Sequence, residues 1–562
     1  MHEVPIAAEG KLRTFAEAGM ISPADFHLAR RMTARDEHED ALLAFALATR
    51  ELRHGSVCLP LAEAPLLKAG LDAEEGAEQP ESALEWPDPA SWHDVVAASA
   101  AVADGGPFTF VDGRLYLTRF HRQERAVARA LARRRELPLD EGFTVLPGGG
   151  DPDEQQDRAV AAALRHRTSV ITGGPGTGKT TTVVRIINSL GRRRPVSAAL
   201  AAPTGKAARQ LDEAVGAHLE PGAVSELHSG TLHRILGKRV RGTDATYHAG
   251  NPLPYDVVVV DETSMVSLEH MASLLEAVGP DTRLVLVGDP HQLRSVEAGA
   301  VLADIVANPS LLQLGSVVEL RTNRRSQPDI TALADAIDAG DTKGALEVID
   351  GATAITWHDF DGHSIAGQPL FRSDVVGTAR AVVTAAGAGD ARAALDAMNR
   401  HRVLCAHRVG HYGVQGWARA ARDVIAAELP EYGMARHYVG QPLLLTQNTE
   451  TFSNGDVAVI VARDGELVAA IDQGREPTLV PPVLLDDASD LHAMTIHKAQ
   501  GGQYDTVSVV LPPPGSPLAT RELVYTAVTR ARTGLRIYGS REAFAEAVAT
   551  PVRRASGLAV SS

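Results

Sequence analysis

The clearest chemical signal in the chain is a glycine-rich segment, GGPGTGKT, at residues 173–180. It has the spacing of a phosphate loop, in which backbone N–H groups turn inward around phosphate oxygens at the start of a helix. We expect Lys179 to neutralise the β- and γ-phosphates of ATP, and the Thr180 hydroxyl to ligate Mg²⁺. The predicted nucleotide cradle consists of Gly173, Gly174, Pro175, Gly176, Thr177, Gly178, Lys179 and Thr180.

An acidic pair follows a run of valines in the segment VVVVDETSM. The valines predict a buried strand, and ligands bind beyond the carboxyl ends of strands in open α/β sheets. We expect Asp261 to hold Mg²⁺, usually through water, and Glu262 to activate the attacking water as general base. An acidic pair ending a strand is common in itself, so its position downstream of a phosphate loop carries the interpretation.

Two further segments place amides near this predicted site. In LVGDPHQL, Gln292 follows another strand and is placed to sense the γ-phosphate, although Asp289 could equally make this a simple capped turn. In DPDEQQDRAV, Gln156 precedes the first strand, and its amide can read N6 and N7 of adenine. Gln155 is a rival for that role.

Arginines and a polar loop come from more distant parts of the chain. ELRTNRRS (319–326) and YTAVTRAR (525–532) supply guanidinium groups, which suit the charge that grows on a γ-phosphate in the transition state. TIHKAQGGQYD (495–505) carries His497, Lys498 and Gln500, which could face nucleic acid or nucleotide. Most arginines in any protein are solvated, so these residue types do not fix the assignment by themselves.

The elements that must position these residues are short apolar strands alternating with helices. Strands this apolar are buried on both faces, which predicts parallel sheets covered by helices and two α/β lobes. Closely spaced β segments around 433–490, with an Asn-Gly-Asp turn at 454–456 suited to a tight hairpin, predict a small all-β insertion. The predicted strands lie at 168–172, 197–203, 256–262, 283–289, 402–407, 505–512 and 535–540.

The front of the chain is rich in Ala, Glu and Asp and is predicted to form amphipathic helices. Residues 71–92 are acidic and contain proline, which indicates an exposed loop, and 145–154 form a second break. The expected fold class is α/β. The expected division is a helical domain at 1–115, a first lobe at 116–330, a second lobe at 331–562, and the β insertion at 433–490 within it.

Composition narrows the possible partners. The 562 residues carry a net charge of −15, so any nucleic-acid site must be a local groove rather than a basic coat. We expect no secretory signal, because the start MHEVPIAAEGKLRTF has no basic region followed by an apolar one. We expect no membrane partner, because no apolar run approaches the roughly 20 residues that span a bilayer. Two distant cysteines, Cys58 and Cys405, exclude a disulfide framework and favour the cytoplasm.

In their order along the chain, these motifs resemble those of superfamily 1 helicases. GSVCLPL (55–61), VLCAHRVGHYGVQG (403–416) and the NGDVA turn further resemble the RecD family of RecBCD-type helicase-nucleases. The resemblance implies RecA-like lobes, an SH3-like insertion, and ATP-dependent 5′-to-3′ translocation on single-stranded DNA at duplex ends. It also implies RecB-like and RecC-like partner subunits, with the front domain as a docking module for the RecC-like one. The ordered matches are Gln156, GGPGTGKT, APTGKAA, TLHRILG, DETSM, GDPHQL, TNRR, TIHKAQG and YTAVTRAR.

The same resemblance assigns residues. Arg325 fits the first phosphate-contacting arginine, with Arg324 as a rival, and Arg530 fits the second. The implied catalytic set is therefore Lys179, Asp261, Glu262, Gln292, Arg325 and Arg530. Implied DNA contacts, each of which could instead be a local cap or loop residue, are Thr204, Gly205, Lys206, Thr231, His233, Thr495, His497 and Lys498.

Three other interpretations need to be weighed. A nuclease site is not expected, because the Asp-x-Lys at Asp341–Lys343 is predicted to be a helix-to-helix junction without a partner strand, so cleavage is assigned to a partner subunit. A stand-alone superfamily 1 helicase is the nearest rival. A nucleotide-binding scaffold without motor activity is disfavoured, because a pure switch could dispense with Glu262.

Overall fold

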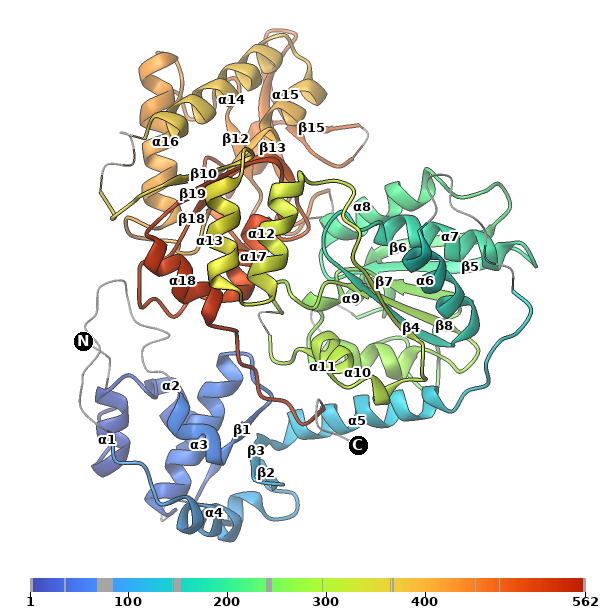
Figure 1. Ribbon diagram of the computed structural model, residues 1–562, viewed down its shortest axis with the longest axis vertical. Coiled ribbons are helices and arrows are strands. Elements are labelled where there is room, and N and C mark those ends of the chain that lie inside the picture. Colours follow the sequence, from blue (N-terminus) through green and yellow to red (C-terminus); the bar gives the residue numbers. More distant parts are fainter. Residues whose placement is uncertain are drawn as a thin grey trace.

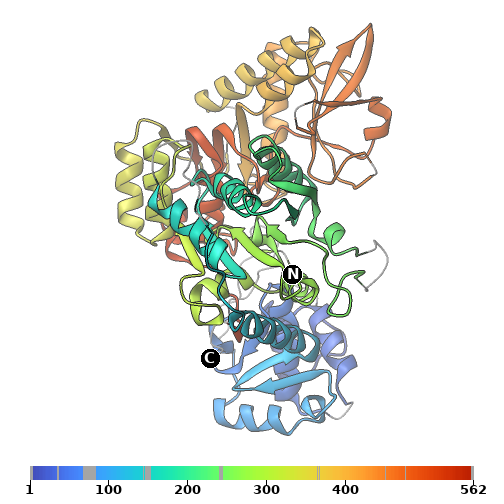
Figure 2. The same cartoon turned by 90° about the vertical axis from the view of Figure 1, so that its right-hand side faces the viewer.

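The computed structural model describes residues 4–34, 37–67, 84–143, 145, 153–238, 245–295, 297–363, 365, 368–449, 451–474 and 476–558. Two parallel and two antiparallel sheets occur in these ranges. Figure 2 shows the β insertion (orange) and the front domain (blue) at opposite ends of the molecule. The α/β fold with two RecA-like lobes is confirmed. Residues 71–83 of the predicted acidic loop and 146–152 of the predicted break lie outside the described residues.

The first lobe is built on a six-stranded parallel sheet in the order β6-β5-β7-β8-β4-β9. Strand β4 is buried throughout between β8 and β9, because its residues face helices on both sides. The strands are β4 (Thr168–Gly173), β5 (Val196–Ala202), β6 (Val224–Thr231), β7 (Val257–Val260), β8 (Arg283–Gly288) and β9 (Val317–Leu320); the helices are α6 (Glu154–Arg165), α7 (Lys179–Gly191), α8 (Gly205–Gly216), α9 (Leu232–Ile235), α10 (Leu268–Ala277) and α11 (Val301–Ala307).

The second lobe holds a five-stranded parallel sheet in the order β10-β19-β18-β11-β17. Trp417 packs against Phe371 and Tyr538, with ring centroids 5.1 and 5.0 Å away. Its elements are α12 (Pro328–Asp338), α13 (Thr342–Gly351), β10 (Ile355–His358), α14 (Pro369–Gly387), α15 (Ala391–Met398), β11 (His401–Cys405), α16 (Val414–Glu428), β17 (Met494–Thr495), β18 (Tyr504–Val510), α17 (Arg521–Val528), β19 (Ala531–Tyr538) and α18 (Arg541–Ala549).

The stretch around Asp341 is the predicted helix-to-helix junction. The Asp341 carboxylate accepts a hydrogen bond from the backbone N–H of Gly344 at 2.9 Å and so caps α13. The side chain of Lys343 is exposed and forms an ion pair with Glu347, one turn further along the helix. Both side chains of the Asp-x-Lys pair therefore have local structural partners.

The β insertion is a five-stranded antiparallel sheet, and one expectation about it was wrong. Asn454–Asp456 does not form a tight hairpin, because residues 445–456 separate its two flanking strands. The two-residue hairpin lies at Asp464 and Gly465, whose φ angles of 52° and 82° suit the left-handed positions of a type I′ turn. The strands are β12 (Pro442–Leu444), β13 (Val457–Arg463), β14 (Glu466–Ile471), β15 (Thr478–Val480) and β16 (Ser489–Asp490).

The front domain is not helical alone, contrary to expectation. A three-stranded antiparallel sheet packs beneath its helices, with Phe108 stacked on Phe45 at 4.4 Å. Trp92, expected in an exposed loop, is 2% exposed and donates a hydrogen bond to the Asp40 carbonyl at 2.8 Å. The elements are α1 (Gly10–Glu17), α2 (Pro23–Met32), α3 (Glu39–Arg53), β1 (Cys58–Pro60), α4 (Pro89–Ala98), β2 (Phe108–Val111) and β3 (Arg114–Leu117).

Helix α5 (Thr118–Arg135) runs from the front domain along the first lobe (Figure 1). Buried Arg134 fixes its end, donating to the Thr168 hydroxyl at 2.5 Å and to the Thr282 carbonyl at 2.8 Å. At its other end, the Glu124 carboxylate accepts from the backbone N–H of Gly557 at 2.9 Å. The hydrogen bonds of Arg134 hold the end of the helix on the first lobe, and the hydrogen bond of Glu124 holds the last described residues against the helix.

The last described residues of the chain lie against the front domain. The Ala555 carbonyl accepts from Val57 N–H at 2.8 Å, and Leu558 is fully buried. The sequence-based division had placed this tail in the second lobe, because nothing local in it indicates a distant contact. Among the described residues, no helix combines the length and the apolar character needed to cross a bilayer.

Asp304 on α11 gives a pH-dependent prediction. Burial, together with the charge of Glu124, raises its pKa from 3.8 to about 6, against the opposing effects of Ser556 and Arg294. A carboxyl whose folded-state pKa is raised loses stability as the pH rises from the unfolded value through the folded one. We expect Asp304→Asn to increase the free energy of unfolding by up to about 3 kcal/mol at neutral pH. The gain should vanish below about pH 4.

Urea unfolding measured across this pH range provides the test. Asp464→Asn is the matched control, because the Asp464 side chain is 97% exposed. A gain in Asp304→Asn that stays the same from pH 4 to pH 8 would contradict the explanation.

Candidate functional site

A cavity of about 580 Å³ lies between the two lobes. The first lobe contributes the phosphate loop, the acidic pair after β7 and the amide after β8, and the second contributes the loop before β18 and the segment before β19. The structure brings all six predicted catalytic residues to this cavity: Lys179, Asp261, Glu262, Gln292, Arg325 and Arg530.

The phosphate loop has the backbone shape that its glycines allow. Gly178, the residue before α7, has a φ of 85°, and a Cβ atom there would lie 2.3 Å from the Nε2 of Gln156. The Lys179 ammonium donates to the carbonyls of Gly173 at 2.6 Å and Gly174 at 2.9 Å. Because α7 begins at Lys179, its first N–H groups are available to an anion in the loop. Pro175, Gly176 and Thr180 also line the cavity.

The acidic pair is half-buried and locally strained. Asp261 accepts a hydrogen bond from the N–H of Glu262 at 2.8 Å, and Glu262 has left-handed backbone angles of 51° and 39°. Burial raises the pKa of both carboxyls, and the charge of Lys179 opposes this. A non-glycine residue in this conformation is costly and is found mainly at functional sites. Two adjacent, half-buried carboxyls also favour a nearby cation.

Arg530 approaches the same cavity from the second lobe, just after α17. It is 2% exposed and donates to the carbonyls of Thr526 and Gly502, each at 3.1 Å. Burial lowers its pKa, and the negative charge of Glu262 across the cleft opposes the shift most strongly. The two lobes therefore face each other here through opposite charges.

The structure separates the neighbouring arginines 324 and 325. Arg324 lies outside the cavity and forms an ion pair with Asp153 at 3.2 Å. Arg325 lines the cavity and donates to the side chain of Gln503 at 2.9 Å. Asn323 fixes this turn, because its side-chain oxygen accepts from the backbone N–H of Arg325 at 2.9 Å. Neither Asn323 nor Gln503 is among the site residues that the sequence predicts.

The neighbouring glutamines also point to different places. Gln156 is 6% exposed, and its amide lies 3.4 Å from the carbonyl of Thr177 in the phosphate loop. Gln155 instead accepts from the backbone N–H of Arg321 at 2.7 Å, outside the cleft. Of the two, Gln156 is placed beside the predicted nucleotide.

Gln292 belongs to a polar link between the lobes that the sequence analysis recognised only in part. Its amide nitrogen donates to Asp289 at 2.9 Å, and the Tyr525 hydroxyl donates to the same carboxylate at 3.2 Å. The N–H of Leu293 donates to the Thr526 hydroxyl at 2.9 Å. Tyr525 and Thr526 precede Arg530 in the motif YTAVTRAR. Their place in this motif is the only sequence signal for their role in linking the lobes.

The buried side-chain oxygen of Gln292 has no hydrogen-bond partner among the described residues. Thr180 and Asp261 line the same cavity. An unpaired amide oxygen, a threonine hydroxyl and a half-buried carboxyl fit a hydrated Mg²⁺ and a phosphate group, since this ion takes oxygen ligands. In the described ranges, the interlobe cavity included, no group of three or more His, Cys, Asp or Glu side chains is arranged for a metal ion.

The predicted DNA-contacting residues do not converge on one cavity. Thr204 and Thr231 each cap a helix, accepting from the N–H groups of Ala207 at 3.2 Å and Arg234 at 3.3 Å. Lys206 lines the interlobe cavity. Gly205 lies at the start of α8, His233 contacts His270 through their ring nitrogens at 2.7 Å, and His497 is partly buried next to Lys498.

Thr495 and Lys498 line a separate cavity of about 410 Å³ in the second lobe. Three arginines border it, Arg408, Arg419 and Arg422. Arg422 is already paired with Asp490 at 3.1 Å. The remaining charge makes this the most basic cavity near the predicted DNA contacts, in keeping with a local groove in an acidic protein.

Two RecA-like lobes that share a cleft containing a phosphate loop, an acidic pair and an arginine from the opposite lobe define a superfamily 1 helicase. Three family models match the chain: "RecBCD enzyme subunit RecD, N-terminal domain" at residues 17–116, an AAA domain at 156–298, and a UvrD-like helicase C-terminal domain at 490–538.

Relatives that match this chain over nearly its whole length are also RecD subunits. The RecBCD enzyme subunit RecD of Mycolicibacterium smegmatis is 43% identical, over 97% of this chain and 98% of its own length. That of Mycobacterium tuberculosis is 40% identical, over 98% and 97%. The chain belongs to the RecD family. A structure of two coordinating Pif1 helicases at forked double-stranded DNA is 17% identical, with a TM-score of 0.40, covering 69% of this chain and 92% of that one.

The two arginines give a matched prediction. We expect Arg325→Ala to lower kcat for ATP hydrolysis by roughly a thousandfold, the scale of an arginine that meets γ-phosphate charge. Arg324→Ala removes only an exposed ion pair and should change kcat less than about fivefold. Steady-state hydrolysis by both variants provides the measurement. A larger loss in Arg324→Ala than in Arg325→Ala would reverse the assignment.

Proposed function

We propose that this protein is an ATP-dependent translocase that moves 5′ to 3′ on single-stranded DNA, as the RecD subunit of a RecBCD-type helicase-nuclease that processes double-strand breaks. The observation that carries the proposal is the interlobe cavity, lined by Lys179, Asp261 and Glu262 from one lobe and Arg530 from the other. In such an arrangement, hydrolysis changes the attraction between the lobes and so can move them.

The proposed roles follow from this geometry. Lys179 neutralises the β- and γ-phosphates, and Glu262 accepts a proton from the attacking water. Arg325 and Arg530 meet the charge that grows on the γ-phosphate, and Gln156 orients the base. Thr180 and Asp261 would hold Mg²⁺, which supplies charge neutralisation to the phosphates.

Gln292 is proposed to sense the γ-phosphate. Gln292 lines the cavity, and its buried side-chain oxygen has no partner among the described residues. Its amide nitrogen donates to Asp289, which also accepts from Tyr525 of the second lobe. A change at the γ-phosphate would therefore alter the hydrogen bonds that reach Tyr525 of the second lobe. The DNA strand is proposed to contact Thr495 and Lys498, with Lys206, Thr204, Gly205, Thr231, His233 and His497 as further candidates.

RecB-like and RecC-like subunits are the proposed partners, acting with this chain on duplex DNA ends. The match of residues 17–116 to the N-terminal domain of RecBCD subunits supports docking through the front domain. We assign nuclease activity to a partner subunit. A stand-alone helicase is the second candidate, and its distinguishing property is efficient unwinding without partners.

Lys179→Gln tests the motor. The substitution removes the ammonium that neutralises the phosphates, and we expect DNA-stimulated ATP hydrolysis to fall by about a hundredfold or more. Lys343→Gln is the matched control, because the Lys343 side chain is 88% exposed, pairs only with Glu347 on its own helix and does not line the cavity. Circular dichroism should show an unchanged fold for both variants. DNA-stimulated turnover persisting in Lys179→Gln would contradict the proposal.

Polarity and partnership need a separate experiment. We expect the chain to co-purify with RecB-like and RecC-like proteins. With ATP hydrolysis by the partner subunits abolished, the complex should displace strands from 5′-tailed duplexes and not from 3′-tailed ones. Equal unwinding by the isolated chain would favour the stand-alone helicase, and displacement from 3′-tailed duplexes alone would refute the assigned direction.

A further inference from the structure

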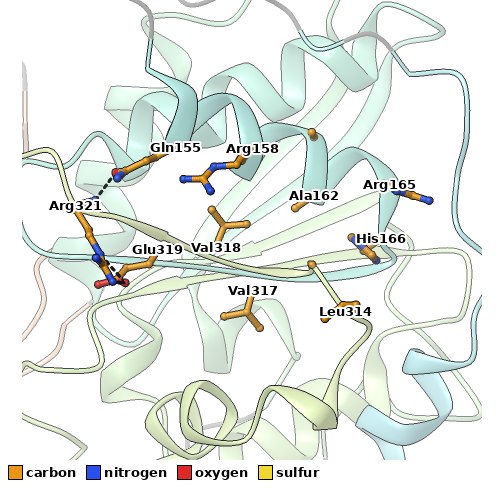
Figure 3. A pocket seen from close by; sticks show the side chains of 12 residues that line it. Gln155, Arg158, Ala162, Arg165, His166, Leu314, Val317, Val318, Glu319 and Arg321 are labelled. Atoms are coloured by element: carbon orange, nitrogen blue, oxygen red, sulfur yellow. Dashed lines mark hydrogen bonds and ion pairs between the residues drawn. The ribbon is translucent and has the colours of Figure 1, made fainter.

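A second large cavity, of about 660 Å³, lies on the outer side of the first lobe and is separate from the interlobe cleft. Helix α6 forms one wall and strand β9 forms the other. Figure 3 shows Arg158 and Arg165 on the helix, and Val318 and Glu319 on the strand below it. We call this cavity the β9 groove.

Strand β9 is the edge of its sheet, and its outer side is unpaired. It pairs only with β4, where Val170 lies opposite Val317 and the N–H of Val170 donates to the Ser316 carbonyl at 2.8 Å. In a parallel ladder, alternate residues of a strand bond to each side, so the N–H and C=O groups of Val317 and Glu319 point away from β4. Among the described residues, nothing hydrogen-bonds to them on that side.

The helical wall carries positive charge. Arg158 and Arg165 are exposed, and within the described part of the chain neither forms an ion pair or a side-chain hydrogen bond. Seven residues on a helix span about 10 Å. On one face of an extended strand, side chains two residues apart are separated by about 7 Å, and side chains four residues apart by about 13 Å. Two carboxylates on one face of a strand bound in the groove can therefore contact both arginines.

The end of the groove is apolar and exposed. Leu314, in the loop that leads into β9, is 99% exposed and lines the cavity. Arg321 closes the other end, where its guanidinium pairs with Glu319 at 2.8 Å and its N–H is held by Gln155. The open length is therefore the stretch of Val317 to Glu319.

We propose that the β9 groove binds an extended acidic segment of a partner protein, which adds to the first-lobe sheet as a further strand. The backbone groups of Val317 and Glu319 would pair with that segment, as in other cases of strand addition. Arg158 and Arg165 would contact its carboxylates, and Leu314 would cover an apolar side chain. Free edges of this kind are usually protected, so an uncovered one beside two unpaired arginines points to a ligand.

The test uses fluorescein-labelled peptides and fluorescence anisotropy on the full chain. A ten-residue peptide of alternating Glu and Val should bind, whereas alternating Lys and Val should not. Alternating Glu and Pro keeps the charge but cannot pair as a strand, because proline lacks the N–H, and it should bind at least about tenfold more weakly. In hydrogen exchange, the amides of Val317 and Glu319 should slow on binding of the first peptide.

Charge-reversed variants locate the site. Arg158→Glu combined with Arg165→Glu should weaken binding of the Glu-Val peptide by roughly tenfold or more, because like charges then face each other. Arg122→Glu with Arg129→Glu is the matched control, since these arginines are also exposed and seven residues apart, on α5. Both double variants should keep the thermal unfolding midpoint of the parent chain.

Three results would overturn the proposal. One is equal binding of the Glu-Val and Glu-Pro peptides, which would indicate charge attraction without strand pairing. Another is equal weakening by the two double variants. The third concerns nucleic acid: if reversal of Arg158 and Arg165 abolished binding of a ten-nucleotide oligothymidylate and left peptide binding intact, the groove would be a nucleic-acid surface instead.

Discussion

The interlobe cleft depends on the compensation of charges that have been removed from water. Burial raises the pKa of Glu262 and lowers that of Arg530, and each shift is opposed by the other residue across the cleft. Charges removed from water are costly unless they are compensated, so this attraction across the cleft favours keeping the two lobes together. A triphosphate that arrives or loses its γ-phosphate changes this balance, which gives the proposed motor its source of force.

The parts of the site that lie within one continuous segment could be predicted from the sequence. The phosphate loop and the acidic pair each follow an apolar strand, and a parallel sheet brings the carboxyl ends of its strands to one edge. Gly178 and Glu262 have the unusual backbone angles that their positions in these turns require. Local sequence therefore determined both the element and the direction of its end.

Choices between adjacent residues could not be predicted in this way. Successive positions on a helix or turn point in different directions, and only the neighbouring elements decide which one faces the site. Gln156 lies against the phosphate loop while Gln155 holds β9, and Arg325 enters the cleft while Arg324 turns to Asp153. The front-domain sheet was missed for a related reason, because its strands have three or four residues and show little alternation.

The same two elements border both the cleft and the β9 groove. Helix α6 presents Gln155 to the groove and Gln156 to the phosphate loop, and the segment after β9 presents Arg321 to the groove and Arg325 to the cleft. The hydrogen bond between Gln155 and the Arg321 backbone joins the two elements at this point. A strand added to β9 would therefore contact the two elements that hold Gln156 and Arg325, both of which are proposed to contact ATP. A partner bound in the β9 groove could in this way change the rate of hydrolysis without entering the cleft.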